Sequence, residues 1–265
     1  MRSAQLDQAA GLRRALAPRR LRVLPVAAGR RGVGRTTVAL GIARAAAEAG
    51  RRTVLLDAAG DAAAALALTW RWELLDLLRG EREYAEVALA APGGVRIVPA
   101  ARGVAALAEA GEHGARLFEA FANLSSRPDL LVFNAPAREP AACALVPADA
   151  ELLLVTTASA EAVKATYARL KTLVRRHGRR SARLFVNRAC AERARELHAH
   201  MAAVARRFLG VELLWGGALG AAPELAALGA AAAVGPAHAR FAALAASLDD
   251  WRLAEFGAPR AAASP

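Results

Sequence analysis

The stretch GRRGVGRTT, from Gly29 to Thr37, has the residue types and spacing of a loop that binds phosphate. It fits the pattern G-x-x-x-x-G-K-[ST] at every position except the lysine, which is Arg35 here. Three glycines let the backbone curl so that successive amides point inward, and a helix that starts near Thr36 adds its positive end. The stretch therefore predicts an anion-binding loop in which Thr36 offers a hydroxyl to a metal. A glycine-rich turn that binds nothing is the alternative.

The loop lies between an apolar run and a segment of helical periodicity, and the same alternation continues along the chain. The expected strands are 22–28, 52–58, 95–100, 129–135, 151–157, 182–187 and 211–214, and the expected helices are 36–49, 72–78, 116–124, 160–176, 191–208 and 237–251. Strands such as TVLLDA are apolar throughout, which is typical of a parallel sheet covered on both faces. We expect a doubly wound, mostly parallel α/β fold with helices on both faces and the site at the carboxyl edge of the strands.

Composition narrows the class of protein without selecting a partner. The chain has 265 residues, 55% of them apolar, and a formal net charge of +12. We expect one domain over residues 21–265, preceded by a short helix and linker over residues 1–20. The positive charge favours contact with nucleic acid, anionic lipid or acidic protein. Cys143 and Cys190 follow no pattern, and no secretory signal is evident, so a cytoplasmic protein with free thiols is expected.

Several of these segments resemble the ParA/MinD family of P-loop ATPases, over about residues 21–248. The family's deviant loop K-G-G-V-G-K-T-T aligns with Arg30–Thr37, RRTVLLDA resembles its strand that ends in D-x-D, and RLFVNRA resembles its strand beside the adenine. The resemblance implies an α/β P-loop fold that binds ATP or ADP. The implied nucleotide-binding residues are Gly29, Arg30, Arg31, Gly32, Val33, Gly34, Arg35, Thr36, Thr37, Asp57, Asn187 and Arg188. Asn187 is alternatively a cap at the end of its strand.

Two loop arginines stand at the family's lysine positions. The first lysine of the family reaches the phosphates of a partner across a nucleotide-dependent homodimer, and Arg30 has the charge and length to do so. The second lysine bridges the β- and γ-phosphates, and here it is Arg35. Arginine keeps the charge but is a planar fork, so this exchange is not conservative in a tight loop. Arg31 replaces a glycine where the backbone comes close to phosphate or to the partner.

The residues that the family uses for hydrolysis are largely replaced. Asp57 keeps the first carboxylate of D-x-D, but the second falls on Ala59. Asn134 replaces the aspartate of the magnesium shell, and Arg138 replaces a glycine that senses the γ-phosphate. Phosphoryl transfer depends on metal charge and a positioned water, so we expect weak or no ATP hydrolysis.

The losses leave the role of Mg²⁺ open, with Thr36 and Asp57 as its candidate ligands. Asp61 is close enough in sequence to replace a lost carboxylate. One hypothesis is that the three loop arginines accept a nucleotide or another polyanion with little help from magnesium. The alternative is that the arginines are solvated or pair with Asp57 and glutamate residues, and that the pocket is empty.

The N-terminal residues carry a second motif. Asp7, Gln8, Ala9, Leu12 and Arg13 match D-Q-A-x-x-L-R, which resembles the activator helix of the FlhG group, also called FleN or YlxH, within the ParA/MinD family. That group controls flagellar number and placement. The resemblance implies that this helix binds the GTPase FlhF and stimulates its hydrolysis, with flagellar C-ring proteins or transcription factors as further partners. So short a helix is marginal alone and is expected to order on its partner. A tolerated amphipathic extension is the alternative.

The closing helix resembles in its placement the family's membrane-contacting helix. Its apolar residues are Phe241, Leu244, Leu248, Trp251 and Leu253, and they favour an anionic membrane surface as a partner. The nearby acidic residues favour docking onto the sheet instead. Three functions therefore remain open at this stage: a nucleotide-switched FlhG-type regulator, a scaffold with the fold but no nucleotide cycle, and a ParA-type protein that binds nucleoid DNA.

Overall fold

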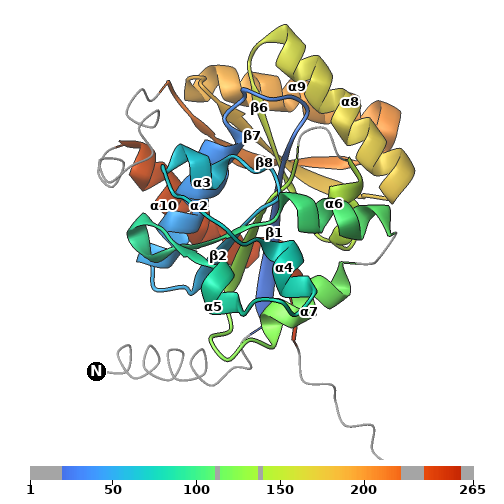
Figure 1. The fold of residues 1–265 in the computed structure, drawn as a ribbon. Helices are drawn as coiled ribbons and strands as arrows, with labels where there is room; N and C mark the ends of the chain where they lie inside the picture. Colours follow the sequence, from blue (N-terminus) through green and yellow to red (C-terminus); the bar gives the residue numbers. More distant parts are fainter. Residues whose placement is uncertain (1–19, 111–113, 137–139, 222–235, 258–265) are drawn as a thin grey trace, which may run out of the picture.

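The computed structural model describes residues 20–110, 114–136, 140–221 and 236–257. Among these residues nine strands form one sheet, in the order β3-β4-β2-β5-β1-β6-β7-β8, with β9 beside β1 (Figure 1). All pairs are parallel except β3 with β4 and β9 with β1. The strands are β1 (Leu21–Ala28), β2 (Thr53–Asp57), β3 (Leu89–Ala90), β4 (Arg96–Pro99), β5 (Leu130–Asn134), β6 (Leu153–Thr157), β7 (Ser181–Asn187), β8 (Glu212–Leu219) and β9 (Ala254–Phe256). The predicted doubly wound fold is confirmed.

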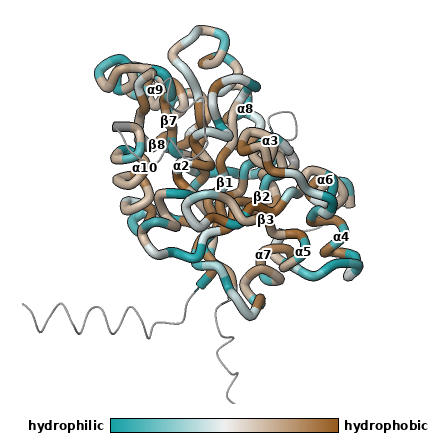
Figure 2. The backbone as a smooth tube through the Cα atoms, turned by 60° about the vertical axis from the view of Figure 1, so that its left-hand side comes forward, coloured by the Kyte–Doolittle hydropathy of each residue, from teal (hydrophilic) through white to brown (hydrophobic). Residues whose placement is uncertain are grey.

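Helices cover both faces of this sheet. Figure 1 shows α2 and α10 on one side and α6, α7, α8 and α9 on the other. The helices are α2 (Arg35–Glu48), α3 (Ala62–Ala65), α4 (Leu74–Leu78), α5 (Tyr84–Val87), α6 (Ala101–Glu109), α7 (Ala115–Ala122), α8 (Ala160–His177), α9 (Ala191–Leu209) and α10 (Pro236–Ser247), with short 3₁₀ turns η1 (Pro92–Gly94), η2 (Pro140–Leu145) and η5 (Leu248–Asp250). Each face has its own apolar core. Figure 2 colours the backbone by the hydropathy of each residue, and it accordingly shows hydrophobic residues in β1 and β2 near the centre of the molecule.

Strand β1 lies inside the sheet, at the switch point where the order of the strands reverses. It pairs with β5 on one side and with β6 on the other. In open parallel sheets this switch point is where ligands bind, outside the carboxyl ends of the strands. The loop after β1 and the ends of β2, β5 and β7 therefore meet at one edge.

The closing segment differs from its predicted form. The helix was expected to reach Trp251, but α10 ends at Ser247 and the chain continues as the 3₁₀ turn η5 to Asp250. Arg22 from β1 donates hydrogen bonds to the carbonyls of Leu248 (2.6 Å) and Trp251 (3.0 Å), and it binds the Asp249 carboxylate at 2.8 Å. A residue more than 200 positions away therefore holds this turn against the sheet. Sequence periodicity alone could not show this contact.

The apolar residues of this closing segment are all inside the fold. They are Phe241, Leu244, Leu248, Trp251 and Leu253, each at most 9% exposed. The expected docking onto the sheet is therefore what the structure has. Among the described residues, no helix has both the length and the apolar character needed to cross a membrane.

Candidate functional site

The predicted phosphate loop joins β1 to α2, as its sequence indicates. Gly32 and Gly34 have φ of +82° and +84°, the left-handed region that glycine adopts freely. Gly29 packs against α8 so closely that a Cβ there would lie 2.2 Å from the carbonyl carbon of Ala165. Each of these glycines is therefore needed for the shape of the loop. The first residue of α2 is Arg35, and no acidic residue occupies its first turn.

The two predicted base-side residues both bind the loop itself. The Nδ2 of Asn187, at the end of β7, donates to the carbonyl of Val33 at 2.9 Å, and its Oδ1 accepts from the Arg188 amide at 3.0 Å. Arg188 donates from its guanidinium to the carbonyl of Gly32 at 3.3 Å. A Cβ on Gly34 would lie 2.1 Å from the Asn187 Nδ2, so the two residues fit closely. Asn187 thus caps its strand and fixes the loop.

Arg35, at the position of the phosphate-bridging lysine, points into the protein. Its side chain is 9% exposed. Its Nε donates to Asn134 Oδ1 at 2.8 Å, and its Nη2 donates to Asp61 Oδ2 at 3.3 Å. Burial lowers the pKa of Arg35 from its ordinary value, while the carboxylates of Asp61 and Asp57 oppose that shift. The guanidinium is therefore already paired within the chain.

Asp61 is the carboxylate that faces the loop. Besides Arg35, it binds Thr36, whose hydroxyl donates to Asp61 Oδ1 at 2.6 Å. The amide Nδ2 of Asn134 donates both to Asp61 Oδ1, at 3.1 Å, and to Asp57 Oδ1, at 2.9 Å. This orientation of Asn134 is the only consistent one, because a flipped amide would set its oxygen against two carboxylates and its NH₂ against a guanidinium.

Asp57 is the last residue of strand β2, and its side chain is buried. It is 1% exposed, and its carboxylate accepts hydrogen bonds from the amides of Gly60 (3.2 Å) and Ala62 (2.7 Å). Burial raises the pKa of Asp57, while the hydrogen bonds from Ala62 and Asn134 oppose the rise. Asp57 therefore stabilises the turn that carries Asp61. The carboxylate that accepts the Thr36 hydroxyl is that of Asp61, not that of Asp57.

The fold implies Mg²⁺ beside a nucleotide, so the donors must be compared with what this ion needs. Magnesium takes six oxygen ligands in an octahedral arrangement. Both oxygens of Asp57 accept N–H donors, and the hydroxyl of Thr36 is bound to Asp61. Asn134 presents an NH₂ to the two carboxylates, and the guanidinium of Arg35 adjoins them. In this arrangement the residues do not form a magnesium site.

Arg30, at the position of the cross-dimer lysine, lies outside this cluster. It forms an ion pair with Glu161 of α8, and both side chains are exposed. Arg31 is also exposed, and Thr37 and Ala59 are half-buried. Arg138 and the motif from Asp7 to Arg13 lie outside the described residues.

Sequence reasoning missed Arg169, which belongs to the same neighbourhood. It is 6% exposed, donates to the carbonyl of Pro136 after β5 at 3.1 Å, and opposes the charge of Arg35. A signal was present, because Arg169 lies on the buried stripe of α8 with Ala162, Thr166 and Leu173. An arginine on an apolar stripe indicates a buried partner.

Comparison with known proteins identifies the family to which this fold and loop belong. Residues 24–226 match the family described as CobQ/CobB/MinD/ParA nucleotide binding domain. The chain belongs to this family. It is also 36% identical, over 206 residues, to the antiactivator FleN of Pseudomonas aeruginosa, which covers 75% of this chain and 73% of FleN. This relative places the chain in the FlhG/FleN group of the ParA/MinD family, as the motifs indicated.

Solved structures of the family share the fold. The MinD cell division protein of Aquifex aeolicus superposes with a TM-score of 0.65 at 20% identity, over 86% of this chain and 97% of that protein. The septum site-determining protein MinD of Pyrococcus horikoshii, solved with Mg-ADP, gives 0.62 at 18% identity, over 86% and 96%. These similarities show the fold alone. The chemistry of the site depends on the residues that this chain has there.

Proposed function

We propose that this protein is an FlhG-type regulator of flagellar number and placement with a degenerate nucleotide site. The observation that carries the proposal is the 36% identity to FleN over most of both chains. The motif from Asp7 to Arg13 supports it, because it matches the activator helix of the FlhG group. The regulator acts on an FlhF-type GTPase through residues 1–20, and on flagellar C-ring proteins or transcription factors through its folded domain.

The nucleotide site serves as a switch with weak or no hydrolysis. Support comes from the loop between β1 and α2, whose shape suits phosphate, and from the lost carboxylate at Ala59. ATP or ADP binds there, and two copies of the chain pair through the nucleotide with the exposed Arg30 reaching the partner. We place the protein in the cytoplasm, peripherally at the inner face of the cell membrane while it is engaged with flagellar components.

The test of the regulator is the GTPase rate of an FlhF-type partner. The full chain should raise that rate, and deletion of residues 1–16 should abolish the increase while the thermal unfolding of the domain stays the same. A point variant refines the test: Gln8→Ala removes one side chain of the motif and should weaken the stimulation. Its matched control is Ser3→Ala, which lies outside the motif and should stimulate like the wild type. Stimulation that survives the deletion would show that residues 1–16 are not the activating segment, and no stimulation by the full chain would show that the assignment to FlhF is wrong.

A scaffold without a nucleotide cycle is the second candidate, and the internal pairing of Arg35 favours it. The two candidates differ in one measurement. Nucleotide binding that changes the affinity for the FlhF-type partner supports the switch. Equal partner affinity with and without saturating ATP or ADP supports the scaffold, because a ligand that does not distinguish two states cannot shift them.

A further inference from the structure

We propose that the phosphate loop accepts a nucleoside di- or triphosphate without magnesium, and that the incoming phosphate displaces the carboxylate of Asp61. This inference rests on the proposed nucleotide site and says how that site works. Its starting point is that Asp61 already holds the side-chain donors that a phosphate would need. The Thr36 hydroxyl and the Arg35 Nη2 both donate to it, at 2.6 and 3.3 Å.

Exposure places Asp61 between the solvent and the buried cation. The side chain of Asp61 is 40% exposed, and that of Arg35 is 9% exposed. A ligand that enters from solvent therefore meets Asp61 first and competes with it for the same donors. A phosphate has more acceptor oxygens than a carboxylate and suits the planar fork of arginine, so it can replace the carboxylate at this position.

Asn134 makes the exchange possible without a metal ion. With an aspartate at this position, three carboxylates would lie together and would need a cation to reduce their repulsion. Asn134 instead donates from one NH₂ group to both Asp57 and Asp61, and accepts from Arg35. The guanidinium and the amide thus balance the acidic groups. When phosphate replaces Asp61, the same guanidinium compensates one of its negative charges.

The turn that carries Asp61 permits the side chain to leave while the backbone stays. Asp57 holds this turn through the amides of Gly60 and Ala62, on both sides of Asp61. Asp61 is the N-cap residue of α3, yet its side chain makes no capping hydrogen bond there. Aspartate at an N-cap normally accepts a bond from the amide of the second or third helical residue, whereas Asp57 already accepts from the first, Ala62. The displaced carboxylate can take that role through a change of rotamer.

Titration calorimetry on the full chain tests the inference, with ADP and with a non-hydrolysable ATP analogue, in magnesium chloride or in EDTA. The wild type should bind with affinities that differ by less than about threefold between the two conditions. Asp61→Ala should bind at least about tenfold more tightly, because no internal charge competes for Arg35 and Thr36. Glu196→Gln, an exposed change of the same charge on α9, should bind like the wild type.

Three outcomes would overturn the inference. Asp61→Ala could bind no more tightly than the wild type, it could bind no nucleotide at all, or magnesium could tighten wild-type binding by about tenfold or more. Thermal unfolding checks that the variant is folded. If Asp61→Ala is unfolded, Asp61→Asn keeps the size of the side chain and removes its charge, and the same tightening is expected.

A second variant tests whether Asn134 removes the need for a cation at this site. Asn134→Asp removes the shared NH₂ donor and adds a carboxylate, so this variant should need a cation. Its nucleotide affinity should fall at least about tenfold in EDTA and recover in magnesium chloride. Equal affinity in both conditions would overturn the role given to Asn134. These binding measurements involve no flagellar partner, so they can fail or succeed independently of the FlhF assay.

Discussion

At the scale of single residues, Asp57 shows how burial changes the role of a familiar motif. The carboxylate is almost fully covered and is held by two backbone amides and one side-chain amide. Removal from water disfavours its charged form, and this is the largest influence on it. The residue therefore acts as a structural acceptor whose charge is a burden on the folded state near neutral pH.

A pH series on Asp57→Asn tests this description. Because the folded pKa of Asp57 lies above its ordinary value of 3.8, the folded wild type binds more protons than the unfolded chain between 3.8 and that raised value. Stability at this site therefore increases as the pH falls through this interval. The unfolding free energy of the wild type minus that of the variant, from urea denaturation, should grow as the pH is lowered from 7 towards 4. Parallel pH curves for the two proteins would contradict the assignment.

The sequence predicted most of the residues of the site, but not how they pair. The glycine spacing and the positions of Asp57, Asn134 and Asn187 were all evident from motifs. The pairing of Arg35 with Asp61 was not, because it depends on the direction of two side chains around a turn. Asn187 was assigned to the base side or to a strand cap, and neither assignment predicted that its amide donates to the loop carbonyl of Val33. The positions of the motifs indicate which residues lie near one another in the site. Side-chain packing then determines which of their atoms form hydrogen bonds.

At the scale of elements, the site depends on how closely the loop packs against α8. A Cβ on Gly29 would lie 2.2 Å from the carbonyl carbon and 2.4 Å from the next amide nitrogen of that helix. Both neighbours are backbone atoms, which cannot rotate away. The loop and α8 would have to separate, and the loop would then lose the position that Asn187 and α2 give it.

Gly29→Ala should therefore destabilise the fold. The expected loss in unfolding free energy is about 1–3 kcal/mol, the usual range for overpacking, and the contact with backbone atoms favours the upper end. Gly220→Ala is the matched control, because a Cβ there meets no heavy atom within 4 Å and its φ is not left-handed. That control should stay within about 0.5 kcal/mol of the wild type. Equal urea midpoints for the two variants would contradict the close packing.

Elements differed in how well sequence predicted them, and packing explains the difference. The parallel strands were evident because each contains a short apolar run, although β8 continues to Leu219, beyond its predicted end at residue 214. Helix α6 was missed, and it contains Gly103, a residue that weakens a helix prediction. A Cβ there would lie 2.9 Å from a carbon of Leu74, so close contact with α4 requires the glycine. Strand β9 has three residues and exists only through its pairing with β1.

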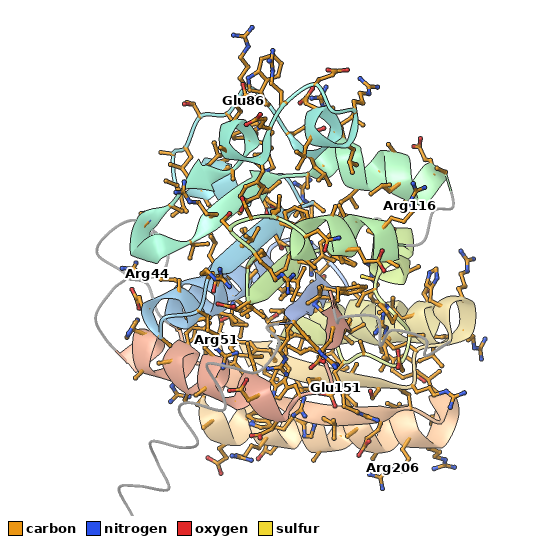
Figure 3. All side chains as sticks on the ribbon, turned by 90° about the horizontal axis from the view of Figure 1, so that it is seen from below. Arg44, Arg51, Glu86, Arg116, Glu151 and Arg206 are labelled. Carbon is orange, nitrogen blue, oxygen red and sulfur yellow. The ribbon has the colours of Figure 1, made fainter. Side chains whose placement is uncertain are left out.

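At the scale of the whole molecule, most charged side chains lie at the surface, and a few are buried with a partner inside the fold. Figure 3 shows Arg206 at the edge of the molecule, whereas Glu151 lies inside, where it pairs with Arg183 at 2.6 Å. The net charge of +12 is thus carried mainly by surface arginines, which suits acidic partners and weak, salt-dependent contact with polyanions. The apolar side chains of the closing segment are buried, so membrane contact through α10 requires that this helix leave the fold.

Substitution of Phe241 tests whether this side chain packs in the core or contacts a membrane. It is 3% exposed, and its ring lies against α2 where a Cβ on Gly41 would be 2.4 Å away. Phe241→Ala should lower the unfolding free energy by about 3–4 kcal/mol and should increase flotation with anionic vesicles, because α10 then undocks more easily. Phe208→Ala, at a phenylalanine that is 62% exposed, should change the unfolding free energy by less than about 0.5 kcal/mol. A Phe241→Ala protein of unchanged stability that binds vesicles less well would instead show that this side chain faces the membrane.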